Sequence, residues 1–118
     1  MATEASRTAA EVFRHHAQAM TAGDLDEIVS DYADDARFIT QAGVLRGKQG
    51  VRDAFANLFA ELPDPRFDVH TRMLEGDVLF LEWTATATGS RADDGVETFV
   101  VRDGQIALQT MHYNLRSE

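Results

Sequence analysis

The order of elements in this chain is set by the segment spanning residues 22–40, which reads AGDLDEIVSDYADDARFIT. Gly23 is typical of a residue that ends a helix, because glycine adopts the left-handed backbone conformation without a steric penalty. Asp24, followed three residues later by Glu27, is typical of the start of another helix. The segment therefore predicts that one helix ends at Gly23 and that a short second helix runs on to about Ala33.

The residues before this segment predict the first helix. Apolar side chains recur at steps of three and four residues from about Ser6 to Ala22, which is the spacing of a helix with one buried stripe. His16 falls on that stripe, whereas His15 points about 100° away from it.

The end of the segment 22–40 and the residues after it predict a strand, a loop and a third helix. The Asp34-Asp35 pair indicates a turn, and Ala36 to Thr40 alternates as a short strand does. Gln41 to Gly47 is predicted to be a loop. Gly47 to Leu62 has helical spacing and is followed by prolines that cannot continue a helix.

The second half of the chain predicts four consecutive antiparallel strands, because it is rich in β-branched and aromatic residues. They span Phe67 to Leu74, Val78 to Thr88, Val96 to Arg102 and Gln105 to Asn114, with breaks at residues 75–77, 89–95 and 103–104. The Asp103-Gly104 pair predicts a tight hairpin turn.

Size, charge and composition limit what the chain can bind. With 118 residues we expect one domain spanning residues 1–118. The net charge is -9, so we expect no nucleic-acid partner, because phosphate binding needs a basic surface. The chain has no cysteine and no metal-ligand motif, and we expect no metal or cofactor. It lacks a signal-like start or an apolar run that could span a membrane, which favours a cytoplasmic protein without a membrane partner.

Several short motifs together carry a family resemblance. They are Ala22-Gly23-Asp24-Leu25-Asp26, Tyr32-Ala33-Asp34-Asp35-Ala36, the glycines Gly43 and Gly47, and the Asp-Gly-x-Ile of Asp103 to Ile106. With the predicted element order, they make the chain resemble the SnoaL-like and ketosteroid-isomerase-like branch of the NTF2-like superfamily. The resemblance covers nearly the whole chain. It implies an α+β cone, in which three N-terminal helices pack on a strongly curved antiparallel sheet and enclose a cavity.

The resemblance also implies positions for catalytic groups. The tyrosine that donates a hydrogen bond to the ligand oxygen in the isomerases corresponds to His16, and their general-base aspartate corresponds to Thr40. Their protonated aspartate, a known example of a carboxylic acid kept neutral by its apolar surroundings, corresponds to Glu97. A threonine has no useful basicity near neutral pH. We therefore expect no authentic ketosteroid isomerase activity, and the chain is more similar to the polyketide-cyclase side of the family.

Each catalytic candidate also has a purely structural interpretation. His16, Glu97 and Tyr32 form the predicted catalytic set, with Tyr32 in a hydrogen bond to His16. His16 could instead be a buried histidine bonded to a backbone carbonyl. Glu97 shares a face with Phe99; if that face points inward, burial raises its pKa, and if not, its carboxyl lies in solvent.

Aromatic and polar side chains around the predicted cavity are candidate ligand-binding residues. For any one of the aromatic residues, filling the core is the alternative interpretation. The candidates are Phe38, Thr40, Phe55, Phe59, Trp83, Phe99, Tyr113 and His112. It stays open which face of the sheet His70 and His112 lie on, because a bulge in either strand would move the side chain to the other face.

Two functions remain open from the sequence. The first is a cofactor-independent isomerase or polyketide-cyclase-type enzyme that uses acid/base chemistry on a small apolar ketone. The second is a non-catalytic module that binds a small apolar molecule or a protein. The strand from Val78 puts threonines beside Phe80 on its outer face, which predicts a homodimer formed through the sheet.

Overall fold

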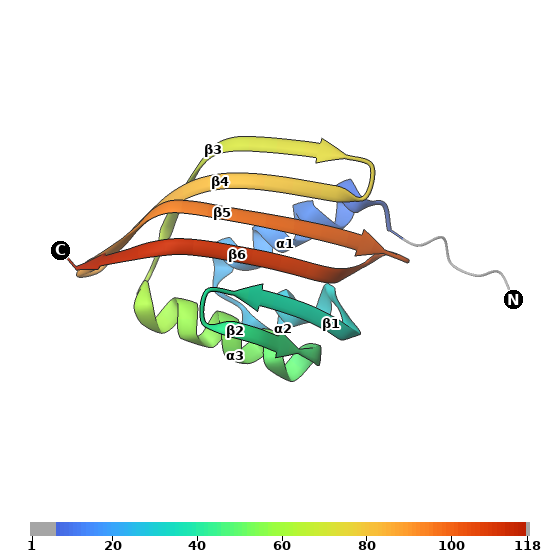
Figure 1. Cartoon of the computed structure of the whole chain (residues 1–118), viewed down its shortest axis with the longest axis horizontal. Coiled ribbons are helices and arrows are strands. Elements are labelled where there is room, and N and C mark those ends of the chain that lie inside the picture. The colour runs from blue at the N-terminus through green and yellow to red at the C-terminus, as the bar shows by residue number, and fades with distance from the viewer. Residues whose placement is uncertain (1–6, 118) are drawn as a thin grey trace, which may run out of the picture.

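The computed structural model describes residues 7–117, so the predicted start of the first helix at Ser6 lies outside the described residues. Three helices cover one face of a curved six-stranded sheet (Figure 1). The elements are α1 Ala9–Ala22, α2 Leu25–Ser30, β1 Tyr32–Thr40, β2 Gly43–Arg46, α3 Gly47–Glu61, β3 Arg66–Glu75, β4 Val78–Ala87, β5 Ser90–Arg102 and β6 Gln105–Ser117. The predicted α+β class is confirmed.

The ends of the first two helices follow the predicted local signals. Thr8 caps α1 in a capping box with Glu11, and Gly23 ends α1 at a φ of 66°. The Asp24 side chain accepts a hydrogen bond from the backbone N–H of Glu27 and so begins α2. The prediction that α2 extends to about Ala33 was wrong, because the chain already enters β1 at residue 32.

The strands that flank α3 differ most from the prediction. Asp34 and Asp35 lie inside β1, where the pairing with β6 shifts register, and not in a turn. The expected loop from Gln41 to Gly47 contains β2, which pairs antiparallel with β1. Short edge strands such as β2 carry little sequence signal, because their pairing is determined by the neighbouring strand.

The sheet has the order β2-β1-β6-β5-β4-β3, and β1 runs parallel to β6 while the other neighbours are antiparallel. The four C-terminal strands are therefore consecutive neighbours, as predicted. Asp103 and Gly104 form the β5–β6 turn with φ angles of 53° and 75°, which are the two positive values that a tight hairpin turn requires.

β5 begins earlier than predicted. The break expected over residues 89–95 is confined to the turn before Ser90, and the strand continues through Asp93 and Asp94 with a register shift against β6. Asp94 has a φ of 53°, a conformation that Asp tolerates better than most residues. A bulge replaces the expected loop.

The inner face of the sheet packs toward the helices. In β4 it carries Leu79, Leu81 and Trp83, as predicted, and Leu79 and Trp83 are buried. The core also includes Phe38 of β1 and Phe55 of α3. The longest helix, α3, has 15 residues, and no helix within residues 7–117 is long and apolar enough to cross a membrane.

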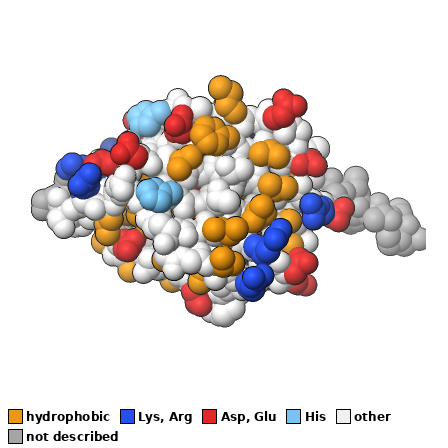
Figure 2. Space-filling model, viewed as in Figure 1, with side chains coloured by type: hydrophobic (Ala, Val, Ile, Leu, Met, Phe, Trp, Pro, Cys, Tyr) orange, Lys and Arg blue, Asp and Glu red, His pale blue; other side chains and the backbone are white. Residues whose placement is uncertain are grey.

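The outer face of the sheet is uncovered by helices and partly apolar. One row of neighbouring residues crosses all six strands on this face: Val44, Ile39, Thr110, Thr98, Phe80 and Met73. Figure 2 shows hydrophobic side chains across this side of the molecule. Met73 is 64% exposed and Val44 is 52% exposed, so apolar surface is available here for the expected dimer contact.

Candidate functional site

A pocket of about 610 Å³ lies between α1 and the inner face of β3, β4 and β5. That volume is in the range of small-molecule sites. Its walls are mostly apolar, and its polar lining groups are few. Two of them, His16 and Glu97, lie in the interior. The other three, Arg14, Thr21 and Arg72, are exposed to solvent.

Glu97 of β5 is the carboxyl group in this lining. The side-chain amide of Gln109 donates a hydrogen bond of 2.7 Å to its Oε1. Gln109 is in turn fixed by Tyr32, whose hydroxyl donates to the Gln109 Oε1. Since Tyr32 and Gln109 are both completely buried, this Tyr32–Gln109–Glu97 relay holds the carboxyl in one orientation.

Burial raises the pKa of Glu97 to about 7, and the hydrogen bond from Gln109 opposes that rise. The indole of Trp83 also favours the ionised carboxyl, although its Nε1 is buried without a hydrogen bond of normal geometry. A carboxyl with this pKa is present in both protonation states at neutral pH. It can therefore both accept and donate a proton.

His16 of α1 is the second polar group deep in the pocket. It is 8% exposed, and its Nδ1 has no hydrogen-bond partner among the described residues. The ring is enclosed by the edges of Tyr32, Phe55 and Phe99, with the centroid of Phe99 5.2 Å away. Burial lowers the pKa of His16 to about 4, so the imidazole is neutral near pH 7 and can donate one N–H.

The predicted hydrogen bond between His16 and Tyr32 was wrong. The two rings pack edge to face with centroids 6.1 Å apart, and the Tyr32 hydroxyl is directed to Gln109. Tyr32 therefore supports Glu97 and not His16. Burial, followed by the charge of Glu97, raises the pKa of Tyr32 well above its usual value, so its hydroxyl keeps its proton.

Trp83 forms a wall of the pocket and is held rigidly. Its indole lies between the rings of Phe67 and Tyr113, at centroid distances of 5.4 and 5.6 Å. It also lies against the backbone of Gly95, its partner across β4 and β5. A Cβ at position 95 would be 2.8 Å or less from three atoms of the indole, so glycine is required there.

The other predicted ligand-binding residues lie outside the pocket lining. Phe38, Phe55 and Phe99 are completely buried in the core. Phe59 is partly buried at a second, more polar hollow beside Pro63. The buried Tyr113 donates its hydroxyl hydrogen bond to Glu61.

Thr40 and His112 also lie elsewhere. The Thr40 hydroxyl is engaged at the β1–β2 turn, where it accepts a 3.0 Å hydrogen bond from the N–H of Ala42. His112 is exposed and pairs with Val96 on the outer face. His70 is exposed at the register shift of β3 and contacts Thr84, so a bulge does change the facing in that strand.

Gln109 was missed by the sequence analysis although it connects Tyr32 with Glu97. The alternation of side chains along β6 could have identified it, because Gln109 lies on the same side of the strand as the buried Met111 and Tyr113. A buried glutamine must satisfy its amide, so this position would have pointed to a polar partner.

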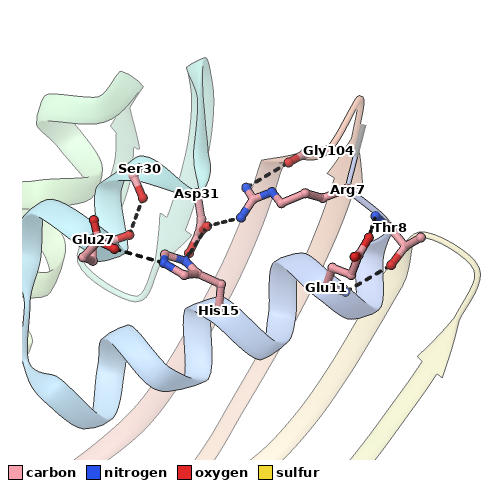
Figure 3. Close-up of polar contacts among 8 residues, drawn as sticks. All are labelled: Arg7, Thr8, Glu11, His15, Glu27, Ser30, Asp31 and Gly104. Carbon is pink, nitrogen blue, oxygen red and sulfur yellow. Dashed lines mark hydrogen bonds and ion pairs between the residues drawn. The ribbon is translucent and has the colours of Figure 1, made fainter. Parts of the chain in front are cut away.

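A second polar cluster lies on the opposite side of α1 (Figure 3). The completely buried carboxylate of Asp31 accepts hydrogen bonds from Arg7 at 2.9 Å and from Nδ1 of His15 at 2.7 Å. Arg7 also reaches the backbone carbonyl of Gly104. The hydrogen bond to Asp31 raises the pKa of His15. This cluster ties the start of α1 to the β5–β6 turn and does not line the pocket.

Within residues 7–117, no three His, Asp or Glu side chains gather in a way that could hold a metal ion. The side chains that line the pocket supply one carboxyl that titrates near neutrality, one neutral imidazole and two guanidinium groups.

Comparisons with known proteins agree with this architecture. Residues 13–109 match the family described as SnoaL-like domain. No match was found among curated proteins.

Similar solved structures include an NTF-2 like protein of unknown function from Burkholderia xenovorans LB400, with 26% identity, a TM-score of 0.74, and coverage of 93% of this chain and 85% of that one. A SnoaL-like protein of unknown function from Burkholderia thailandensis E264 has 26% identity and a TM-score of 0.71, over 90% of this chain and 94% of that one. A proposed ketosteroid isomerase from Kribbella flavida DSM 17836 has 18% identity and a TM-score of 0.74, over 93% and 80%. At that identity the likeness shows the fold alone.

Proposed function

The chain belongs to the SnoaL-like family, and we propose that it transfers a proton on a small, mostly apolar carbonyl compound held in the pocket, without a cofactor. The observation that carries this proposal is Glu97, a carboxyl in an apolar pocket with its pKa raised to about 7 and its orientation fixed by Gln109. Perturbed carboxyls of this kind are typical of catalytic acids and bases.

In the first step, the ionised Glu97 takes a proton from the carbon next to the carbonyl group of the ligand. The electron pair of the broken C–H bond forms the carbon–carbon double bond of an enolate, and the negative charge moves to the carbonyl oxygen. His16 donates its N–H to that oxygen. Because the imidazole is neutral and enclosed by aromatic rings, its hydrogen bond acts in surroundings of low dielectric, where it stabilises charge more than in water.

In the second step, Glu97 gives the proton back. In an isomerase the proton returns to another carbon of the enolate. In a cyclase the enolate carbon attacks a second carbonyl of the same molecule, and Glu97 protonates the resulting alkoxide. Both routes leave the protein unchanged, and both need one group that works as base and then as acid.

Tyr32 and Gln109 are positioning residues in this scheme. Gln109 orients the carboxyl, and its own amide is oriented by Tyr32. Because Gln109 stabilises the ionised form, replacing it should raise the pKa of Glu97 further and shift the pH dependence of the reaction to higher pH.

One observation favours the alternative, a non-catalytic binding module. The position that corresponds to the isomerases' general base is Thr40, and its hydroxyl is engaged at the β1–β2 turn away from the pocket. In this alternative the pocket binds an apolar molecule and Glu97 contributes only polarity.

Deuterium exchange separates the two functions without knowledge of the natural substrate. The probe is 2-tetralone, an apolar ketone whose exchangeable protons are followed by NMR in D₂O. We expect the wild-type protein to accelerate exchange and Glu97→Gln to reduce the rate by about 10² or more, in line with the usual contribution of a general base. Glu75→Gln is the matched control, because Glu75 is exposed at the end of β3 and does not line the pocket. Binding of 2-tetralone without acceleration would establish the binding module instead, and equal accelerated rates in wild type and Glu97→Gln would remove Glu97 from the role of base.

A further inference from the structure

Two arginines line the pocket from opposite sides: Arg14 on α1 and Arg72 on the edge strand β3. Both side chains are exposed, whereas the pocket residues His16, Leu79 and Trp83 are buried. The two guanidinium groups therefore lie at the solvent end of the pocket, and its apolar part lies behind them.

Within residues 7–117, the structure gives neither arginine a hydrogen bond or an ion pair. The charge of Arg14 makes only a minor contribution to the lowered pKa of Glu11, which is due mainly to the hydrogen bonds with Thr8. The nearest acidic neighbour of Arg14 along α1, Glu11, is occupied with the capping box, where its Oε1 accepts a 2.8 Å hydrogen bond from the N–H of Thr8. Glu97 is the acidic residue in the pocket lining, and neither guanidinium contributes to its pKa shift. The N–H donors of both guanidinium groups can thus form hydrogen bonds to a ligand.

From this arrangement we infer that the ligand is an apolar molecule that carries a carboxylate, which Arg14 and Arg72 bind at the pocket mouth. The inference rests on the proposed function and adds the substrate class. A guanidinium presents two parallel N–H donors that match the two oxygens of a carboxylate.

The register of the sheet gives the direction in which such a ligand would lie. Arg72, Leu81 and Glu97 are direct neighbours across β3, β4 and β5 on the inner face. Adjacent strands are about 4.8 Å apart, so the backbone positions of Arg72 and Glu97 are separated by about 10 Å. A molecule that contacts both residues therefore lies across β4, along the row formed by Arg72, Leu81 and Glu97.

The test uses two probes that differ only in charge, 5-phenylpentanoate and its uncharged isostere 5-phenylpentanamide. Binding is measured at pH 7.5 by calorimetry and by the fluorescence of Trp83, which is the chain's single tryptophan and lines the pocket. We expect the carboxylate to bind at least tenfold more tightly than the amide. In the double variant Arg14→Gln/Arg72→Gln, we expect carboxylate affinity to fall to that of the amide while amide affinity stays within twofold of wild type.

Arg102→Gln is the matched control, because this exposed arginine at the end of β5 does not line the pocket. It should leave both affinities unchanged. Equal binding of the two probes by the wild type would overturn the carboxylate inference and leave the proposed function standing. No binding of either probe would remove both. Loss of amide binding in the double variant would also count against the inference, because the arginines would then be supporting the pocket and not recognising charge.

Discussion

Replacing Glu97 by glutamine should make the protein more stable at alkaline pH while it removes the proposed proton transfer. The pKa of the carboxyl is raised in the folded state from 4.5 to about 7. A raised pKa means that folding favours the protonated form. The contribution of Glu97 to stability is therefore fully present below about pH 4.5 and is lost as the pH rises through 7. Glutamine resembles the protonated acid at every pH and avoids this loss.

The size of the effect follows from the pKa difference. The shift from 4.5 to about 7 is about 2.5 pKa units, and each unit corresponds to about 1.4 kcal/mol, so the full penalty is about 3 kcal/mol. The amide oxygen of glutamine can also accept the hydrogen bond that Gln109 now donates to the carboxyl, so this contact is kept. At pH 4.5 the wild type and the variant should have nearly equal free energies of unfolding.

Urea unfolding of both proteins at pH 4.5, 6, 7 and 8.5 measures this difference. The stability of Glu97→Gln relative to wild type should grow with pH and level off above about pH 7.5. The exposed Glu75→Gln is the control, and a surface change of this kind should alter the free energy of unfolding by less than about 0.5 kcal/mol at each pH. A constant difference between Glu97→Gln and wild type across this range would refute the raised pKa and with it the acid/base role.

Three further changes test separate parts of the structure. Gly95→Ala should place a methyl group against the indole of Trp83, which should cost about 1–3 kcal/mol of stability and shift the tryptophan fluorescence maximum; an unchanged spectrum would show that the ring is not held there. Asp31→Asn should remove the counter-charge of Arg7 and His15 and lower the free energy of unfolding by about 1–3 kcal/mol, less than for a fully buried pair because both cations are partly exposed. The expected homodimer through the outer face of the sheet predicts that Phe80→Asp gives a monomer by size exclusion with light scattering, and a wild-type protein that is already monomeric at micromolar concentration would contradict it.

Much of the fold could be predicted from the sequence where a single residue type decides the local backbone. Gly23 and the Asp103-Gly104 pair adopt the positive φ angles that their positions indicate, and Asp24 caps α2 as its spacing with Glu27 predicts. The errors came where pairing between distant strands decides the structure. β2 exists because β1 offers it a partner, and that information is not local in the sequence.

The candidate site, like the fold, could be predicted from the sequence only in part. The alternation of Glu97 with Phe99 left two facings open, inward or toward solvent, and in the structure Glu97 lines the pocket. The destination of the Tyr32 hydroxyl could not be predicted, because Gln109 is 77 residues away and reaches Tyr32 only through the parallel pairing of β1 and β6. For a related reason, the sequence could not distinguish aromatic residues that fill the core from those that line the pocket. Phe38 and Trp83 have the same alternation signal, and only the position of α1 leaves space beside one of them.

The two titratable groups inside the pocket differ in their ability to carry the proton. In water a histidine is the weaker acid of the two, with an ordinary pKa of 6.5 against 4.5 for a glutamate. In the pocket the order is reversed, because burial lowers the pKa of His16 to about 4 and raises that of Glu97 to about 7. An ion pair between the two would have moved both pKa values in the opposite directions, since each charge would stabilise the other. The pocket therefore favours the neutral form of both groups, and at neutral pH Glu97 exchanges protons while His16 stays neutral and offers its N–H as a hydrogen-bond donor.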